Sequence, residues 1–218
     1  PEYGEAHAVL AHILAWRTFN GWTEDWQQTA QDALSHADRA LALAPDDPAV
    51  LTDAGFARWL LGRFFKSVPI LERAVALNPN AALTCALCGI VLSTVDRTDE
   101  GFALVEKAFR LSPRDPLEYL FHCGMVFCHF FAGQYEAAKA AADRTLQSHP
   151  DFAYATIFRA AACVRLDELE EARGILARVE KAGFGWVIDR IFFANAEGTL
   201  WADFTGAIRQ AMDREPRT

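Results

Sequence analysis

Apolar and polar positions along the chain form amphipathic runs that come in pairs, with a helix-breaking residue between the two runs of a pair. Residues 50–62 read VLTDAGFARWLLG and residues 63–77 read RFFKSVPILERAVAL, with Gly62 at the break. The same layout returns at residues 121–133 and 134–146, where Gly133 marks the break. Large apolar residues recur three or four positions apart, which is the spacing of one face of an α-helix. The pattern predicts units made of a helix, a turn and a second helix.

Prolines close these units at regular intervals. Pro45, Pro79 and Pro113 follow one another at intervals of 34 residues, and Pro150 comes 37 residues after Pro113. Proline cannot continue a helix, because it lacks the amide donor and clashes with the preceding turn. A helix pair cannot bury its apolar face alone, so a fixed period of this length predicts stacked repeats.

The interval that ends at Pro150 holds three more residues than the others. Residues 116–133 form an apolar run without a breaker. We therefore expect the extra residues to lengthen the first helix of that unit by about one turn, at about 1.5 Å per residue.

The residues at these positions resemble the tetratricopeptide repeat (TPR) family. The family's small residues, its turn and its closing proline match Ala54-Gly55, Gly62-x-Phe64, Ala74 and Pro79, then Cys88-Gly89, Ala108 and Pro113, then Gly133-x-Tyr135, Ala138 and Pro150. The sequence departs from the pattern at four positions. Asp96 replaces a turn glycine, Ser67 and Gly101 replace an alanine, and Pro69 lies inside a second helix.

The resemblance implies an all-α fold, a right-handed superhelical solenoid of about five helix-turn-helix units with a C-terminal capping helix. We expect one domain over residues 1–218, because no linker or low-complexity stretch interrupts the chain. The chain starts at Pro1 without a methionine, so we expect it to be a piece of a longer protein. The expected repeats are residues 1–47, 48–81, 82–115, 116–152 and 153–183, followed by C-terminal helices over residues 184–214.

Charge and hydropathy limit the partners. The formal net charge is −8, and the 21 basic residues are scattered along the chain. A phosphate backbone would be repelled, so we expect no direct nucleic-acid binding. No apolar run reaches the length of a membrane span, about 18 residues, so we expect no membrane insertion.

Five cysteines raise the question of a metal site. Cys85-x-x-Cys88 has zinc spacing, and Cys123 and Cys128 lie beside His122 and His129. Cys85 and Cys88 fall inside a predicted helix with no turn to fold them round an ion, and cysteine is often buried. We therefore predict core packing and no metal or other cofactor. The two histidines share a helix face, where they either line a groove or have structural roles. The odd cysteine count favours a reducing compartment, so we expect a cytoplasmic protein.

The sequence contains none of the common catalytic motifs. G-x-S-x-G, H-E-x-x-H, the phosphate-binding G-x-x-x-x-G-K-[ST] and a dinucleotide-binding G-x-G-x-x-G after a strand are all absent. Acidic pairs such as Glu170-Glu171 are typical of solvated helix faces. We therefore do not expect an enzyme.

Residues 16–28, WRTFNGWTEDWQQ, form an irregular insert in the first unit and carry Trp16, Trp22 and Trp26. Insertions in repeat arrays often lie on a binding face, and the alternative is that these rings cap the N-terminal edge. The stretch also resembles the repeat regions that follow cyclase or winged-helix DNA-binding domains in bacterial regulators. That resemblance implies a sensing or interaction module.

The first helix of each unit should line a concave face. This face lacks the basic, amide-rich set with which related proteins hold a peptide's C-terminal carboxylate. We predict a non-catalytic scaffold that binds a peptide or helix from a protein partner, from a second copy, or from the chain's own tail near Phe192 and Trp201. The alternative is a regulatory effector or oligomerisation module of a larger bacterial regulator. In a competing interpretation the same side chains are ordinary inter-repeat core. The predicted partner-binding residues are Trp16, Phe56, Trp59, Leu60, Ile90, Phe127, Tyr154, Ile157 and Arg165.

Overall fold

The computed structural model describes residues 2–181 and 199–212. Within these two stretches the regular structure is helical and contains no strand. The helices run α1 (Gly4–Phe19), α2 (Trp26–Leu43), α3 (Pro48–Leu60), α4 (Phe64–Leu77), α5 (Ala82–Ser93), α6 (Thr98–Leu111), α7 (Glu118–Phe131), α8 (Tyr135–Ser148), α9 (Ala153–Arg165), α10 (Leu169–Lys181) and α12 (Thr199–Met212). Of the expected C-terminal helices over residues 184–214, the parts at residues 184–198 and 213–214 lie outside the described residues.

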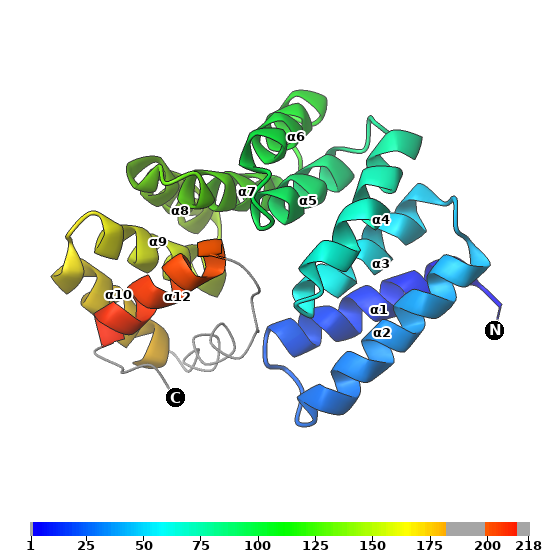
Figure 1. Ribbon diagram of the computed structural model, residues 1–218, viewed down its shortest axis with the longest axis horizontal. Coiled ribbons are helices and arrows are strands. Elements are labelled where there is room, and N and C mark those ends of the chain that lie inside the picture. Colours follow the sequence, from blue (N-terminus) through cyan, green and yellow to red (C-terminus); the bar gives the residue numbers. More distant parts are fainter. Residues whose placement is uncertain (1, 182–198, 213–218) are drawn as a thin grey trace.

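The helices pack as consecutive pairs that stack on one another (Figure 1). The first helix of each pair contacts its own partner, and α1, α3, α5, α7 and α9 contact one another in that order. The second helix of each pair also contacts the first helix of the next pair. α12 packs on α9 and α10. The prediction of an all-α superhelical repeat fold is confirmed.

A residue with positive φ ends the first helix of each pair from the second to the fifth. Gly62 and Gly133 have φ of +76° and +72°, in the left-handed region that glycine adopts without steric cost. Asp96 and Asp167 hold the corresponding turns with φ of 65° and 60°. The departure at Asp96 therefore keeps the backbone geometry of the repeat and changes only the residue that adopts it.

Close helix crossings explain another departure from the repeat pattern. A Cβ atom on Gly89 would lie 2.7 Å from the carbonyl oxygen of Gly101, and one on Gly101 would lie 2.8 Å from the carbonyl oxygen of Gly89. The backbones of α5 and α6 thus meet where neither residue has room for a side chain. Gly101 replaces the usual alanine because this crossing is closer than alanine allows.

The extra three residues before Pro150 lie mainly in a turn, which corrects the prediction of a longer helix. α7 begins five residues after Pro113, whereas α5 begins three residues after Pro79. α7 has 14 residues, only one more than α3 with 13. The Asp115 side chain accepts a hydrogen bond from the Leu117 amide at 2.8 Å and stabilises this longer turn. The apolar run did not reveal it, because its first residues, Pro116 and Leu117, precede the helix.

The five cysteines are core residues, as predicted for Cys85 and Cys88. Each thiol is free and buried. Burial raises the pKa of Cys123 to about 12, and burial together with nearby Glu72 raises that of Cys88 to about 12. Such thiols are unreactive at neutral pH. No helix in the described part of the chain is both long enough and apolar enough to cross a membrane.

Candidate protein-interaction surface

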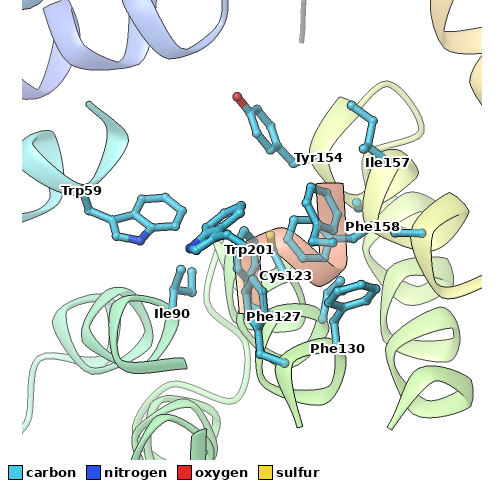
Figure 2. Close-up of a cluster of buried hydrophobic side chains, with 14 of the residues drawn as sticks. Trp59, Ile90, Cys123, Phe127, Phe130, Tyr154, Ile157, Phe158 and Trp201 are labelled. Atoms are coloured by element: carbon cyan, nitrogen blue, oxygen red, sulfur yellow. The ribbon is translucent and has the colours of Figure 1, made fainter. Parts of the chain in front are cut away.

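Aromatic side chains from the first helices of different pairs pack into one continuous cluster. Trp59 of α3 stacks on Phe56, with ring centroids 5.1 Å apart, and meets Phe127 of α7 edge to face at 5.6 Å. Its indole Nε1 donates a hydrogen bond to Thr94 Oγ1 at 3.1 Å. Figure 2 shows the side chains of Trp59, Phe127 and their neighbours converging from α3, α5, α7, α9 and α12. We call these side chains the aromatic cluster, and we include in it the aromatic residues that contact them: Phe19, Phe64, Phe130, Phe131, Tyr154, Phe158, Trp201 and Phe204.

The cluster also joins the first helix pair to the fifth. Phe19, at the end of α1, stacks on Tyr154 of α9 with ring centroids 4.0 Å apart and planes inclined by 8°. The Tyr154 hydroxyl donates a hydrogen bond to the Phe19 carbonyl oxygen at 3.2 Å. Helices that are far apart in the sequence thereby contact each other directly, so the superhelix curls until its first and last pairs meet.

α12 adds two aromatic side chains to the cluster. Trp201 stacks on Phe64 of α4, with centroids 5.2 Å apart, and lies 5.3 Å from Phe131 of α7. Phe204 stacks on Phe158 of α9 at 4.2 Å and meets Phe130 of α7 edge to face at 5.4 Å. Trp201 is 8% exposed and Phe204 is fully buried, so both rings are inserted between helices of different pairs.

A polar contact lies beside these rings. Arg165 Nη2, at the end of α9, is 2.6 Å from Asp203 Oδ1 and 2.5 Å from the Asp203 carbonyl oxygen. The Tyr135 hydroxyl of α8 donates to Asp203 Oδ2 at 3.3 Å. Burial, followed by the negative charge of Asp203, raises the pKa of Tyr135, so the phenol keeps its proton as a donor. The Asp203 carboxylate of α12 is thus held by the Arg165 guanidinium and the Tyr135 hydroxyl.

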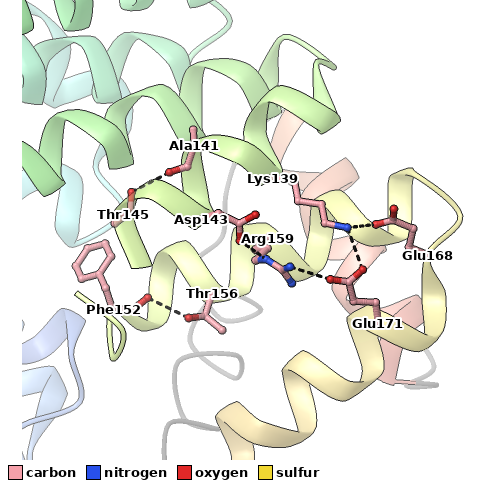
Figure 3. A network of polar contacts seen from close by, with 9 residues as sticks. All are labelled: Lys139, Ala141, Asp143, Thr145, Phe152, Thr156, Arg159, Glu168 and Glu171. Atoms are coloured by element: carbon pink, nitrogen blue, oxygen red, sulfur yellow. Dashed lines mark hydrogen bonds and ion pairs between the residues drawn. The ribbon is translucent and has the colours of Figure 1, made fainter. Parts of the chain in front are cut away.

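A second polar network fixes the helices on which α12 rests (Figure 3). Lys139 of α8 contacts Glu168 and Glu171, the latter at 2.9 Å. Arg159 of α9 contacts Asp143 at 2.6 Å and Glu171 at 2.8 Å. Burial alone would lower the Lys139 pKa, but its two glutamate partners raise it. The network therefore joins α8, α9 and α10, and the raised pKa of Lys139 and the lowered pKa values of Glu168 and Glu171 keep these three groups ionised at neutral pH.

These groups offer no obvious metal site. Cys163, Glu168 and Glu171 place ligand atoms within 4.8 Å of one another, the one such group in the described stretches. The Lys139 ammonium already contacts both carboxylates, so it occupies the position that a cation would take. Burial raises the pKa of the Cys163 thiol to about 11.

The structure brings the predicted partner-binding residues together, but as a covered cluster rather than an open groove. Trp16 is half-buried, and Arg165 is paired with Asp203. Most of the predicted set is buried, which agrees with the inter-repeat core interpretation. The other seven predicted residues are at most 7% exposed: Phe56, Trp59, Leu60, Ile90, Phe127, Tyr154 and Ile157.

Sequence reasoning missed several members of the cluster. In the sequence Phe64 matches only the turn motif, but in the structure its ring stacks on Trp201. Phe130, Phe131 and Phe158 were also missed. The available signal was position, because Phe131 lies four residues after the predicted residue Phe127 and Phe158 adjoins Ile157.

The insert in the first unit differs from the capping interpretation. Trp22 and Trp26 are 60% and 52% exposed, so they do not cover the N-terminal edge. Trp16 packs against Phe19 at 5.8 Å and reaches the aromatic cluster through it. The insert lengthens the second helix of its pair, because α2 has 18 residues and α4 has 14.

A separate groove lies between α6, α7 and α8. It has a volume of about 600 Å³, and both His122 and His129 line it. Burial lowers the pKa of His122, although Glu118 at 3.5 Å opposes this, so the imidazole is largely neutral at pH 7. His129 has a hydrogen-bond partner in Gln134 at 2.7 Å. Both histidines thus line a groove, and each also has a polar partner, Glu118 for His122 and Gln134 for His129.

Comparison with known proteins identifies the fold. No family model and no curated protein matches the chain. A solved TPR protein from Parabacteroides merdae matches with a TM-score of 0.59 and 12% identity, over 94% of this chain and 84% of that one. The chain has the tetratricopeptide repeat fold.

Two further TPR-fold structures show the same likeness. PilW, described as a type IV pilus biogenesis factor, has a TM-score of 0.61 and 19% identity, over 94% of this chain and 89% of its own. A thermophilic TPR protein of Thermus thermophilus also has a TM-score of 0.61 and 19% identity, over 78% of this chain and 91% of its own. At these identities the likeness shows the fold alone.

Proposed function

We propose that this chain is a non-catalytic protein-interaction scaffold whose aromatic cluster binds a helical or extended segment of a partner protein. One observation carries the proposal: the cluster already holds a helix, α12, through two inserted aromatic rings and an ion pair. The TPR fold supports a scaffold in general, and the proposal assigns that role to the aromatic cluster.

The chemistry of the cluster suits such a partner. Large aromatic side chains in water-excluded pockets supply much of the binding energy at protein interfaces. An amphipathic helix can place its apolar residues into a groove of this kind at helical spacing. Arg165 adds a cation that orients an acidic group. The net charge of −8 argues against a nucleic-acid partner.

Site-specific photo-crosslinking in the organism that encodes the protein tests the proposal. Trp16 would be replaced by p-benzoylphenylalanine, because it is a half-buried aromatic residue at the edge of the cluster. Leu77 is the matched control, since it is 46% exposed at the end of α4 and lies outside the cluster. We expect a defined adduct from position 16 and none from position 77.

The mass of the adduct separates the two predicted functions. An adduct with a different protein supports the scaffold, whereas an adduct of twice the chain mass supports self-association, as expected of an oligomerisation module. No adduct at position 16, or the same set of adducts at both positions, would contradict the proposal.

A further inference from the structure

α12 makes contacts that capping the last repeat does not require. A cap needs to cover only α9 and α10, the helices that it packs on. Trp201 instead reaches Phe64 at the start of α4 and Phe131 at the end of α7, in the second and fourth pairs. The first turns of α12 therefore occupy the aromatic cluster in the way that a bound ligand helix would.

The residues that make these contacts form a short recognition pattern. Trp201, Asp203 and Phe204 are an aromatic residue, an acidic residue two positions later and a second aromatic residue three positions later. Positions i and i+3 lie on one side of a helix, so both rings enter the cluster together. The carboxylate between them lies within reach of Arg165 and Tyr135.

α12 leaves two buried polar atoms in this seat without a hydrogen-bond partner in the described part of the chain. They are Arg165 Nε and Trp201 Nε1. A buried donor that has lost water without gaining a partner costs free energy. The contacts of α12 are therefore extensive but not optimal, which favours exchange with another helix.

We infer that the seat of α12 accepts a helix from a partner protein in its place, and that this helix carries an aromatic residue, an acidic residue two positions on and an aromatic residue three positions on. The inference rests on the proposed function, since it names the partner segment that the aromatic cluster would take. α12 is then an internal competitor that covers the cluster until such a helix displaces it.

A peptide-binding experiment tests this directly. The probe is a labelled peptide of residues 199–212, TLWADFTGAIRQAM, and the receptor is the full chain carrying Trp201→Ala and Phe204→Ala. Fluorescence anisotropy should show binding to this receptor at least about tenfold tighter than to the parent chain. In the parent, the tethered α12 competes at a high effective concentration.

Peptide variants show whether binding depends on Trp201, Asp203 and Phe204. A peptide with Asp203→Asn should bind the same receptor about tenfold more weakly, because it loses the negative charge that pairs with Arg165 through Oδ1. A peptide with Trp201→Ala and Phe204→Ala should not bind measurably. Equal affinity of the parent chain and the variant, or of the native and Asp203→Asn peptides, would overturn the inference.

Hydrogen exchange gives a second test if the doubly substituted chain fails to fold. In the parent chain, amides of residues 201–212 should exchange faster than those of α9, and excess unlabelled peptide should accelerate them further by displacing α12. The inference is wrong if α12 exchanges as slowly as α9 and does not respond to the peptide. Crosslinks from position 16 together with no peptide binding would sink this inference alone, whereas the absence of both would sink the proposed function as well.

Discussion

Trp59 packs between repeats and is also one of the predicted partner-binding residues. It is 5% exposed, contacts aromatic rings from three other helices and donates a hydrogen bond to Thr94. A residue in this environment contributes to stability whether or not a partner later binds beside it. The burial of Trp59 therefore stabilises the fold even when no partner is bound.

Replacing Trp59 by Ser should lower the free energy of unfolding by about 3–5 kcal/mol, as large-to-small core changes do. The matched control is Trp22→Ser, because Trp22 is 60% exposed and should change stability by less than about 0.5 kcal/mol. Chemical denaturation followed by circular dichroism measures both. A Trp59→Ser variant as stable as the control would show that Trp59 is not a core residue.

The turn positions allow a test of backbone strain at single residues. Gly62→Ala should cost about 1 kcal/mol, because φ is +76° there while no atom lies near a new Cβ. Asp96→Gly should stabilise by about 0.5 kcal/mol, since removing the Cβ relieves the φ of 65° and outweighs the added chain entropy. Thermal unfolding of both variants checks the opposite signs. Two changes of the same sign would show that side-chain contacts, and not φ, decide the turns.

At the scale of elements, the distance between helices depends on where the chain omits a Cβ. Gly89 and Gly101 face each other at the crossing of α5 and α6, and Gly55 lies against Leu71 at the crossing of α3 and α4. Gly174 of α10 has no such neighbour, since a Cβ there would meet only Arg178 Nη1, at 3.7 Å, among the described residues. Gly55, Gly89 and Gly101 therefore allow close helix crossings, whereas Gly174 has no such role among the described residues.

Gly89→Ala should destabilise the protein by about 2 kcal/mol, because the new methyl group would meet the Gly101 carbonyl oxygen at 2.7 Å and force the helices apart. Gly174→Ala should stabilise it by about 0.5–1 kcal/mol through helix propensity alone. Urea unfolding of the two variants beside the parent provides the comparison. If Gly89→Ala were also stabilising, the close crossing of α5 and α6 would be wrong.

At the scale of the molecule, the charged network on α8, α9 and α10 supports the end of the solenoid that carries α12. Hydrogen bonds from Lys139 lower the pKa of Glu171 and of Glu168 below the ordinary value of 4.5. A carboxyl group whose pKa is lower in the folded state stabilises the fold above pH 4.5, and this contribution is lost as the pH falls through the folded-state pKa.

Glu171→Gln should therefore lower the melting temperature by about 2 °C at pH 7, a small effect because the side chain is partly exposed. The difference from the parent should be smaller at an acidic pH below the folded-state pKa of Glu171, where the native carboxyl group is protonated too. Glu170→Gln is the control, since Glu170 is 87% exposed and lies outside the network. A Glu171→Gln effect that is the same at both pH values would contradict the assigned role of its charge.

The sequence by itself determined the repeat period, the helix pairs and most of their turns. Prolines, turn glycines and apolar spacing act within a few residues, so each can be interpreted without knowing the neighbours. The same local information identified Cys85 and Cys88 as core residues. The sequence wrongly assigned all three extra residues to the first helix of the unit, whereas two of them lie in the turn before Glu118. The error arose because an apolar run does not mark where a helix starts.

Only the tertiary structure decided that the predicted partner-binding residues are covered. The contact between Phe19 and Tyr154, and the reach of Trp201 to Phe64, join segments more than 100 residues apart. Such contacts depend on the small rotation between successive helix pairs, which accumulates along the solenoid. No local pattern encodes this sum, so the sequence identified the aromatic residues but not the partners that they find.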